Sequence, residues 1–398
     1  MICKITGKKI KPFMSFGTMP IANGFLSKKH FKNEFYFKME VGYSKKLSLF
    51  QLNDHPAPKL MFNNNYPFFT SSSKFMVNHF RDYSIWIKKN YFKNVKNIIE
   101  IGSNDGSFLK NFKSRKTNIL GVEPSKNVAN LAKKNGINTL NKFFTYETSQ
   151  KIKRFKNNTD LIVAANAICH IPNLKDLIKG INNLLTKKGL FIFEEPYLGS
   201  MYEKTSYDQI YDEHIFMFSA TSVKKIFNLF GFELINVIPQ KTHGGSMRYV
   251  IGRKNNHKIH KNVKKHLNLE SRKNINSIKG CLKFKKDCEK SKKKLKKKID
   301  DILKKGKKIA GYAATSKSTT ILNYCGIDNR HIDFICDTTK NKINKYTPRT
   351  HIPIVNVEYY RNNIPDYTFL FAWNHKKEIF KKEKKILKKT KWIAHIDL

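Results

Sequence analysis

The pattern of apolar and polar positions changes character twice along the chain. Residues 1–75 consist of short aromatic segments separated by turns, such as FGTMPIANGF and NDHPAPK, with little helical periodicity. This pattern predicts a small irregular or β-rich domain. From residue 76, helical segments alternate with short apolar runs at residues 95–101, 119–122, 161–165 and 190–194. The alternation predicts a parallel sheet with helices on both faces, which is a doubly wound α/β domain over residues 76–253.

The last third of the chain, residues 254–398, carries a second α/β pattern after a lysine-dense stretch. Within residues 254–305, apolar side chains recur near helical spacing, which predicts one or two amphipathic helices with solvated lysine faces. Apolar runs at residues 308–312, 331–336 and 368–372 predict strands, and a helix is expected to end near Gly326. We therefore expect a second, smaller Rossmann-like domain here.

The chain is strongly basic, with 77 Lys and Arg against 30 Asp and Glu and a net charge of +47. Lysine is spread through almost every segment and arginine is scarce. A nucleic-acid surface would concentrate arginine, so we favour a general bias of composition. The basic surface should still attract anionic substrates such as nucleotide sugars.

Cysteine usage and the N-terminus indicate the compartment. The six cysteines form no Cys-x-x-Cys pair, and the start MICKITGKKIKPF has no apolar signal segment. No stretch approaches the ~18 to 20 apolar residues that span a bilayer. We expect a cytoplasmic protein with reduced thiols and without membrane insertion.

A glycine-containing loop follows the first buried strand of the middle domain. Glu100 stands near the end of that strand, and the loop that should open a helix contains Gly102, Asn104, Asp105 and Gly106. Its G-x-x-x-G spacing differs from the G-x-G-x-x-G loop that cradles a pyrophosphate. The negative Asp105 suits a ligand that carries an amino group and a sulfonium and no phosphate.

Two further strand ends support the same ligand. Glu123 ends the next strand about twenty residues on, where an acid usually accepts hydrogen bonds from ribose hydroxyls. Asn166 and His170 follow the third strand on the same side of the sheet. Together, the loop, its spacing and the acidic strand end predict that S-adenosylmethionine binds here.

Polar side chains of the reacting end gather in two later segments. The segment YDQIYDEHIFMFS places Tyr207, Tyr211, Glu213 and His214 in a short span, a density of titratable groups that a structural helix does not need. The segment THGGSMR presents three candidate substrate contacts around a glycine pair, namely His243, Ser246 and Arg248. A tight turn explains this second segment equally well.

At this point the chain resembles the three-domain sugar C-methyltransferases, which act on nucleotide-linked 4-keto-deoxysugars. The resemblance extends over nearly the whole chain, through MPIANGFL, NYPFFTSSS, EIGSNDGSFL, GVEPS, EEPYL, YDQIYDEHIFMFS, HGGSMR, GYAATSKSTTILNYCGI and AWNH. It implies a class I methyltransferase domain in the middle of the chain and a role in deoxysugar or surface-glycan biosynthesis. It also implies that His214 is the general base, with Tyr211 and Glu213 beside it and His170 near the keto oxygen.

The chemistry of such an enzyme accounts for these residue types. A proton next to a ketone is acidic because the carbanion becomes an enolate, so a base and a donor to the oxyanion are needed. Histidine suits the base, since its unperturbed pKa is about 6.5. The resemblance further implies that the C-terminal domain holds the substrate nucleotide, with Lys317 and Asp337 as contacts to phosphate and ribose. A scaffold domain with a helix-capping loop is the alternative.

The first domain departs from the family pattern, which usually holds a structural zinc with two Cys-x-x-Cys pairs. The corresponding positions here are Cys3, Thr6, Ser44 and Leu47. One cysteine cannot form a closed tetrahedral site, so we predict that zinc is absent and that no metal is bound.

A second hypothesis is a nucleic-acid-binding protein, or a nucleic-acid methyltransferase, that uses the same donor fold. The acidic residues of YDQIYDEH are unfavourable beside phosphates. Residues 195–197 resemble only faintly the strand end that stacks a target base in base methyltransferases. We therefore expect a nucleotide-linked sugar and no specific nucleic acid as partner.

Overall fold

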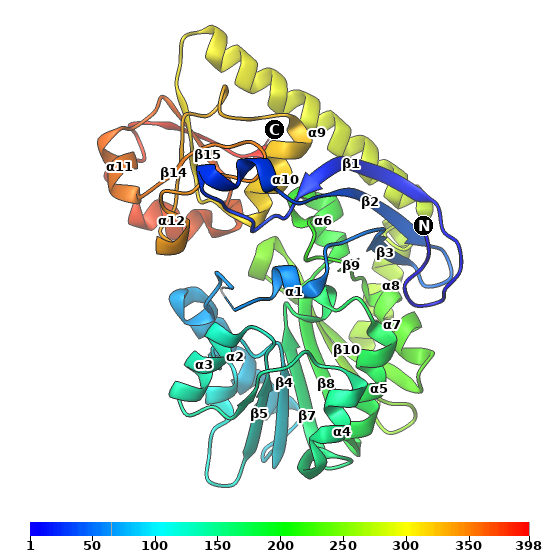
Figure 1. The fold of residues 1–398 in the computed structure, drawn as a ribbon. Coiled ribbons are helices and arrows are strands. Elements are labelled where there is room, and N and C mark those ends of the chain that lie inside the picture. The colour runs from blue at the N-terminus through cyan, green and yellow to red at the C-terminus, as the bar shows by residue number, and fades with distance from the viewer. Residues whose placement is uncertain (65, 398) are drawn as a thin grey trace.

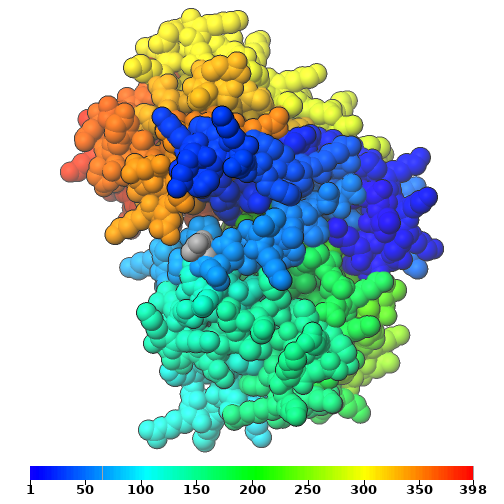
Figure 2. Space-filling model, viewed as in Figure 1, coloured from blue at the N-terminus to red at the C-terminus, as the bar shows by residue number. Residues whose placement is uncertain are grey.

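The computed structural model describes residues 1–64 and 66–397, which form three sheets. In Figure 1 the seven-stranded sheet lies below, and the N-terminal and C-terminal sheets lie side by side above it. Figure 2 shows that the N-terminal and C-terminal residues form one continuous surface on this face of the molecule. Among the described residues, no helix combines the length and the apolar character that crossing a membrane requires.

The N-terminal domain is rich in β-strands, one of the two forms that the aromatic and turn-rich pattern allows. Its sheet is antiparallel, and a distant segment completes it. Its order is β1 (Pro12–Pro20), β2 (Tyr36–Ser44), β3 (Leu49–Leu52) and β9 (Phe216–Met217). Phe50 pairs with Met217 and Gln51 pairs with Phe216. The sheet therefore contains a strand that begins two residues after His214.

The middle sheet has the order β10-β11-β8-β7-β4-β5-β6. The parallel strands are β4 (Asn97–Ile101), β5 (Asn118–Val122), β6 (Thr139–Leu140), β7 (Thr159–Ala165) and β8 (Leu185–Pro196). The antiparallel strands are β10 (Phe232–Gln240) and β11 (Ser246–Arg253). Strand order reverses between β4 and β7, and open α/β sheets bind ligands at such a switch point.

Helices cover both faces of the middle sheet, as predicted. They are α2 (Lys74–Asn90), α3 (Lys126–Lys134), α4 (Tyr146–Lys151), α5 (Leu174–Leu184) and α7 (Ala220–Asn228). The prediction of a helix directly after the glycine loop is wrong, because only a 3-10 turn, Leu109–Phe112, follows the loop. A tight turn closed by a Ser114–Thr117 bridge and the start of β5 leave no room for a longer helix.

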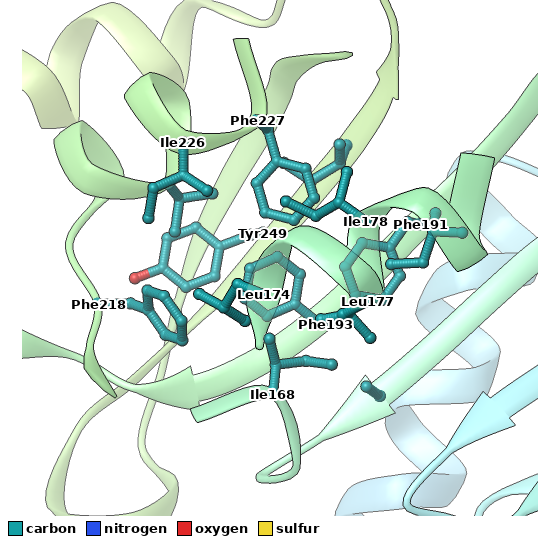
Figure 3. Packing of buried hydrophobic residues seen from close by; sticks show 14 of the residues in the cluster. Ile168, Leu174, Leu177, Ile178, Phe191, Phe193, Phe218, Ile226, Phe227 and Tyr249 are labelled. Carbon is teal, nitrogen blue, oxygen red and sulfur yellow. The ribbon is translucent and has the colours of Figure 1, made fainter. Parts of the chain in front are cut away.

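An aromatic core lies beneath the strands that carry the polar groups. Figure 3 shows Phe191 and Phe193 of β8 packed against Phe227 of α7 and against Leu177 and Ile178 of α5. The Phe191 and Phe193 ring centroids are 5.0 Å apart, and the Phe193 and Phe227 centroids are 5.9 Å apart. This close packing gives the carboxyl ends of β7 and β8 a rigid base.

The C-terminal sheet is parallel, with the order β14-β13-β12-β15-β16. Its strands are β12 (Ile309–Tyr312), β13 (Ile335–Cys336), β14 (Ile354–Val355), β15 (Tyr367–Leu370) and β16 (Lys391–Ile393). Its helices are α10 (Ser316–Cys325), α11 (Val357–Asn362) and α12 (Lys376–Lys382). The strand expected over residues 331–336 is present only as Ile335–Cys336.

The lysine-dense stretch forms two amphipathic helices, as predicted, namely α8 (Lys261–Arg272) and α9 (Ile278–Lys304). Helix α9 buries Cys288, Leu295 and Ile299 and runs along the outside of the molecule from the N-terminal sheet to the C-terminal sheet (Figure 1). Leu282 of the same helix lies off the buried face and is 52% exposed. The helix therefore joins the two upper sheets through one narrow apolar stripe.

Candidate active site

A cavity of about 1070 Å³ lies where the three sheets approach one another. Helix α1 (Pro58–Met61), the carboxyl ends of β4 and β7, and the start of α10 border it (Figure 1). Ten of the residues predicted from the sequence line this cavity: Gly102, Asn104, Glu123, Asn166, His170, Tyr211, Glu213, His214, His243 and Lys317. The fold thus brings both halves of the predicted site to one space.

One wall of the cavity is the loop after β4 together with Glu123. The two carboxylate oxygens of Glu123 accept N–H groups from Asn104, at 2.9 Å, and from Ser125, at 2.8 Å. Each oxygen keeps a lone pair for a further donor such as a ribose hydroxyl. Gly102 has a φ of +70°, and a Cβ there would lie 2.6 Å from the Cβ of Ala167. Only glycine fits this turn without displacing the opposite strand end.

Asn166 supplies a free acceptor on the same wall. Its backbone is left-handed, with a φ of +52°, and its N–H donates to the carbonyl of Glu194 at 2.8 Å. Its side-chain Oδ1 is buried and has no partner among the described residues. A buried acceptor without a partner is rare unless a ligand satisfies it. The cationic amino group of S-adenosylmethionine fits this requirement.

Three residues predicted to bind the donor do not line the cavity. The Asp105 carboxylate accepts N–H groups from Ser71, at 2.7 Å, and from Ser107, at 3.2 Å. It thereby anchors the segment that walls the cavity, and the direct contact expected between Asp105 and a cationic ligand stays a prediction. Glu100 lies buried beneath the loop, and burial raises its pKa well above the ordinary value. A Cβ on Gly106 would lie 2.8 Å from Ile137, so this glycine serves packing.

His214 is held in one tautomer by two hydrogen bonds. Its Nδ1 lies 2.7 Å from the carbonyl of Gln209, which can only accept, so Nδ1 carries the proton. Its Nε2 therefore holds the lone pair and accepts the Tyr211 hydroxyl at 2.7 Å. Burial, reinforced by His170, holds the pKa of His214 well below its ordinary range. His214 is thus a neutral imidazole with its basic nitrogen toward Tyr211.

His170 stacks on His214, with ring centroids 5.3 Å apart. Burial lowers the pKa of His170 to about 4, and its Nε2 has no partner among the described residues. The turn Ile168–His170 is held by Glu195, whose Oε1 accepts the N–H of Ile168 at 2.6 Å. A second neutral imidazole therefore stands beside the first.

Glu213 and Asp212 are bound by the N-terminal segment. Glu213 Oε1 accepts the side-chain amide of Asn23 at 2.7 Å, and Asp212 Oδ1 accepts the N–H of Ala22 at 3.0 Å. Burial raises the pKa of Glu213 to about 7 and that of Asp212 well above its ordinary value. Two buried acids thus contact the N-terminal segment, and of these Glu213 also lines the cavity.

On the opposite wall, His243 and Lys317 meet near the start of α10. Burial, reinforced by Lys317, lowers the pKa of His243 to about 3. Lys317 Nζ donates to Asn374 Oδ1 at 3.2 Å and lies 5.0 Å above the Trp373 ring. Burial lowers the pKa of Lys317 as well. A buried ammonium beside a helix N-terminus is a suitable environment for an anion.

The other predicted substrate contacts lie behind the cavity wall. Arg248 pairs with Glu194 through Nη2 at 2.9 Å and Nε at 3.2 Å, and its guanidinium carbon lies 3.4 Å from the Tyr83 ring centroid. Ser246 Oγ donates to the carbonyl of Thr242. These groups are buried with protein partners and do not line the cavity, so contact with substrate stays a prediction for Arg248 and Ser246.

Tyr207 and Asp337 are also outside the cavity lining. The Tyr207 hydroxyl lies 3.4 Å from the thiol of Cys325, and its ring is fully buried. Asp337 accepts the N–H of Thr339 and lies 4.0 Å from Lys342 Nζ. Both residues therefore position neighbours of the cavity in this structure and do not border it.

Comparison with known proteins decides the class of enzyme. Residues 78–237 match the family model described as methyltransferase domain, and residues 241–396 match the model described as C-methyltransferase C-terminal domain. C-methyltransferase NovU of Streptomyces niveus is 28% identical over 377 residues, which cover 94% of this chain and 90% of that protein. Taken together, these matches show an S-adenosylmethionine-dependent C-methyltransferase.

Solved structures overlap parts of this C-methyltransferase. The PH0226 protein of Pyrococcus horikoshii covers 47% of this chain and 94% of its own, with 14% identity and a TM-score of 0.37. Magnesium protoporphyrin IX methyltransferase of Synechocystis, with S-adenosylmethionine bound, covers 45% of this chain and 79% of its own, with 11% identity and a TM-score of 0.34. The assignment depends on the sequence matches and not on these partial overlaps.

The C-methyltransferase has cavity residues that the sequence did not single out. Tyr66 lines the cavity, and burial beside Glu213 and Glu123 raises its pKa well above the ordinary value. Lys342 reaches the cavity from the 3-10 turn Lys340–Lys342 and donates to the carbonyl of Ala314 at 2.6 Å. The segment NNNYPFF offered a signal for Tyr66, whereas nothing distinguishes Lys342 from the other lysines.

Among the residues that the structure describes, one group of side chains in this C-methyltransferase could hold a metal ion. Cys169, His170 and His214 have ligand atoms within 4.8 Å of one another, but burial raises the pKa of the Cys169 thiol well above its ordinary value. In the N-terminal domain, the Thr6 N–H donates to Cys3 Sγ at 3.5 Å, and Leu47 is buried in the same apolar cluster as Cys3. The absence of zinc remains a prediction, and the packing of Leu47 supports it.

Proposed function

We propose that this C-methyltransferase methylates the carbon next to the keto group of a nucleotide-linked 4-keto-deoxysugar, through an enolate. One observation carries the proposal most directly. A neutral His214, with its lone pair on Nε2, borders the same cavity as the donor loop and the buried lysines of the C-terminal domain. Base, methyl donor and an anionic substrate can therefore meet in one space.

His214 is suited to remove the proton next to the ketone. The hydrogen bond from Nδ1 to the Gln209 carbonyl keeps the proton off Nε2 and orients the ring. Because burial disfavours the imidazolium, the resting state is the free base. The Tyr211 hydroxyl occupies Nε2 in this structure, so it has to turn away as the proton is transferred.

Tyr211 and His170 are suited to stabilise the enolate oxygen. Once the Tyr211 hydroxyl leaves Nε2, it can donate to the oxygen that gains charge. His170 is neutral because its pKa is about 4, and an N–H on its unpartnered Nε2 would donate in the same way. Glu213, with a pKa of about 7, is protonated or charged according to small changes around neutrality.

The donor half of the cavity fits S-adenosylmethionine. Glu123 would accept the ribose hydroxyls, Asn166 Oδ1 would accept the amino group, and Gly102 lets the backbone approach the ligand. When bound, S-adenosylmethionine supplies the electrophilic methyl group that the enolate carbon attacks.

The diphosphate of the substrate would lie at the start of α10. Thr315 and Ser316 border the cavity there, with the buried Lys317 and the partly buried Lys342 beside them. Backbone N–H groups at a helix N-terminus and two ammonium groups together suit a diphosphate. The C-terminal domain would thus hold the nucleotide end while the sugar reaches His214.

The test is to incubate the protein with labelled S-adenosylmethionine and a panel of nucleotide-linked 4-keto-6-deoxysugars, with total RNA beside them. Mass spectrometry should show a methyl group in one sugar, and exchange of the neighbouring proton in heavy water should show the enolate. His214→Ala should abolish both while donor binding persists, and His30→Ala, at an exposed histidine, should change neither. Methyl groups in RNA, or in neither pool, would contradict the proposal.

A further inference from the structure

We infer that Asp208 is a positioning residue for His214. Held by residues of the C-terminal domain, it sets the tautomer and the basicity of His214. The inference rests on the proposed function, in which His214 is the base. Asp208 lies in the 3-10 turn Tyr207–Gln209 and is fully buried. Although it belongs to the middle of the chain, the groups that hold its side chain come from residues beyond 315.

Three cationic or N–H groups surround the Asp208 carboxylate. The indole N–H of Trp373 donates to Oδ2 at 2.7 Å, and Nε2 of His395 lies 3.2 Å from Oδ1. Lys317 Nζ lies 4.0 Å from Oδ2. One carboxylate thus ties the turn to α10, to the turn Trp373–His375 and to the end of the chain.

The next residue, Gln209, carries this attachment to the base. Its carbonyl accepts Nδ1–H of His214 at 2.7 Å, and its side-chain Nε2 donates to the carbonyl of His243 at 2.5 Å. Thr320 Oγ1 of α10 donates to the carbonyl of Ile210 at 2.9 Å. The carbonyl that determines which nitrogen of His214 is basic is therefore fixed between contacts with the C-terminal domain.

Charge adds to this geometric effect. Burial alone would raise the pKa of Asp208, but His395, Lys317 and Trp373 lower it, so the side chain stays a carboxylate. Lys317 also lowers the pKa of His214. Asp208 offsets that positive charge. The other titratable groups facing His214 are Tyr211, Glu213, Cys169, His170 and His243.

Replacing the carboxylate by an amide distinguishes the anchoring and the charge of Asp208 from an effect of its volume on packing. Asp208→Asn keeps the volume, removes the counter-charge of Lys317 and places an amide N–H₂ group toward one of the donors. The pKa of His214 should then fall further, which makes the imidazole a weaker base. A substitution that acted only on folding would leave the pH dependence of the base unchanged.

The experiment measures the exchange of the substrate proton in heavy water against pH, together with S-adenosylmethionine binding and Tm. For Asp208→Asn we expect donor affinity within about twofold of wild type, exchange at least about tenfold slower, and the acid limb of the profile at lower pH. Trp373→Phe keeps the carboxylate and loses one N–H donor, so its exchange should be slowed less. Asp82→Asn, at an exposed carboxylate on α2, is the matched control and should behave as wild type.

The outcomes separate this inference from the proposed function. Absence of exchange in the wild-type protein would contradict the proposed function itself. Two results would overturn the role of Asp208 alone, provided that the wild-type protein shows exchange. One is an acid limb of the Asp208→Asn profile at the same pH as in wild type, and the other is an exchange rate equal to that of wild type in both variants. If Asp208→Asn does not fold, Trp373→Phe decides the question, because an exchange rate equal to that of wild type would refute the positioning.

Discussion

The hydroxyl of Tyr211 donates to Nε2 of His214 across 2.7 Å, so the basic nitrogen is occupied by a neighbouring side chain in this structure. The two residues are three positions apart along the chain, and the turn between them brings their tilted rings to a centroid distance of 4.0 Å. In the proposed reaction, the phenol would leave the base and donate to the substrate oxygen.

Tyr211→Phe should slow methyl transfer by about 10² to 10³, because it removes one donor to the developing oxyanion. Donor binding should stay within about twofold, since the hydroxyl contacts His214 and lies away from the donor loop. Single-turnover methylation and S-adenosylmethionine titration measure the two effects. Tyr146→Phe, at an exposed tyrosine, is the control, and normal turnover in Tyr211→Phe would show that the phenol is dispensable.

The stability contributed by neutral His170 should decrease as the pH falls. Its pKa is about 4 in the folded protein, so between pH 6.5 and 4 the unfolded chain binds a proton that the folded chain does not. Each pH unit in that window costs the folded state up to about 1.4 kcal/mol for this one group. The Tm advantage of wild type over His170→Gln should therefore shrink between pH 7 and pH 5.

Glu213 and Glu195 act in the opposite direction, because burial raises the pKa of each to about 7. Both acids are present in the two proteins, so their effect cancels in the Tm difference. A difference that stays constant with pH would show that His170 is not held neutral by burial.

Gly102→Ala should weaken S-adenosylmethionine binding by tenfold or more. The added Cβ meets Ala167, and the left-handed φ of +70° costs an L residue about 1 kcal/mol. Gly326→Ala is a matched control, because Gly326 has a φ of +65° and nothing lies within 4 Å of the added Cβ. Calorimetric titration should show donor affinity lost only at position 102, and equal affinity in both variants would contradict a close approach of the ligand there.

Arg248→Ala should lower stability and leave substrate recognition largely intact. Breaking a buried ion pair strands the partner charge, here Glu194, and costs about 3 to 5 kcal/mol. The double variant Arg248→Met with Glu194→Gln should recover part of the lost Tm, because no buried charge is left unpaired. A large rise in KM for the nucleotide sugar without loss of Tm would restore Arg248 as a substrate contact.

Lys317→Gln should raise KM for the nucleotide-linked sugar by about tenfold while donor affinity stays constant. The reason is the loss of one ammonium beside the start of α10, where the diphosphate is proposed to lie. Lys279→Gln, at an exposed lysine of α9, controls for general attraction of anions by the basic surface. Equal effects of the two variants, both removed by salt, would indicate long-range attraction instead of a site.

Four of the seven residues predicted to bind the donor line the cavity, namely Gly102, Asn104, Glu123 and Asn166, because their positions depend on local patterns. Buried parallel strands such as β4 are continuous apolar runs, and Glu123 and Asn166 stand directly at strand ends. The side of the sheet on which they lie follows from the direction of the strands.

Pairings between distant residues could not be predicted in this way. Arg248 follows the same glycine pair as His243, yet it turns behind the wall because Glu194 and Tyr83 take its guanidinium. Asp105 was predicted to contact the ligand because of its charge, and in the structure its carboxylate accepts the backbone N–H of Ser71. Which of two partners a polar group meets is decided by tertiary packing and leaves no periodicity in the sequence.

Strand β9 joins the N-terminal sheet two residues after His214, so the boundary between the first two domains does not follow the order of the chain. A chimera that exchanged residues 1–75 for those of a relative would keep the recipient's Phe216 and Met217 as the edge of a foreign sheet. Such a chimera should fold only when residues 216–217 are taken from the same relative as residues 1–75. Residues 1–75 and the segment that carries His214 should therefore change together in evolution, because they share one sheet.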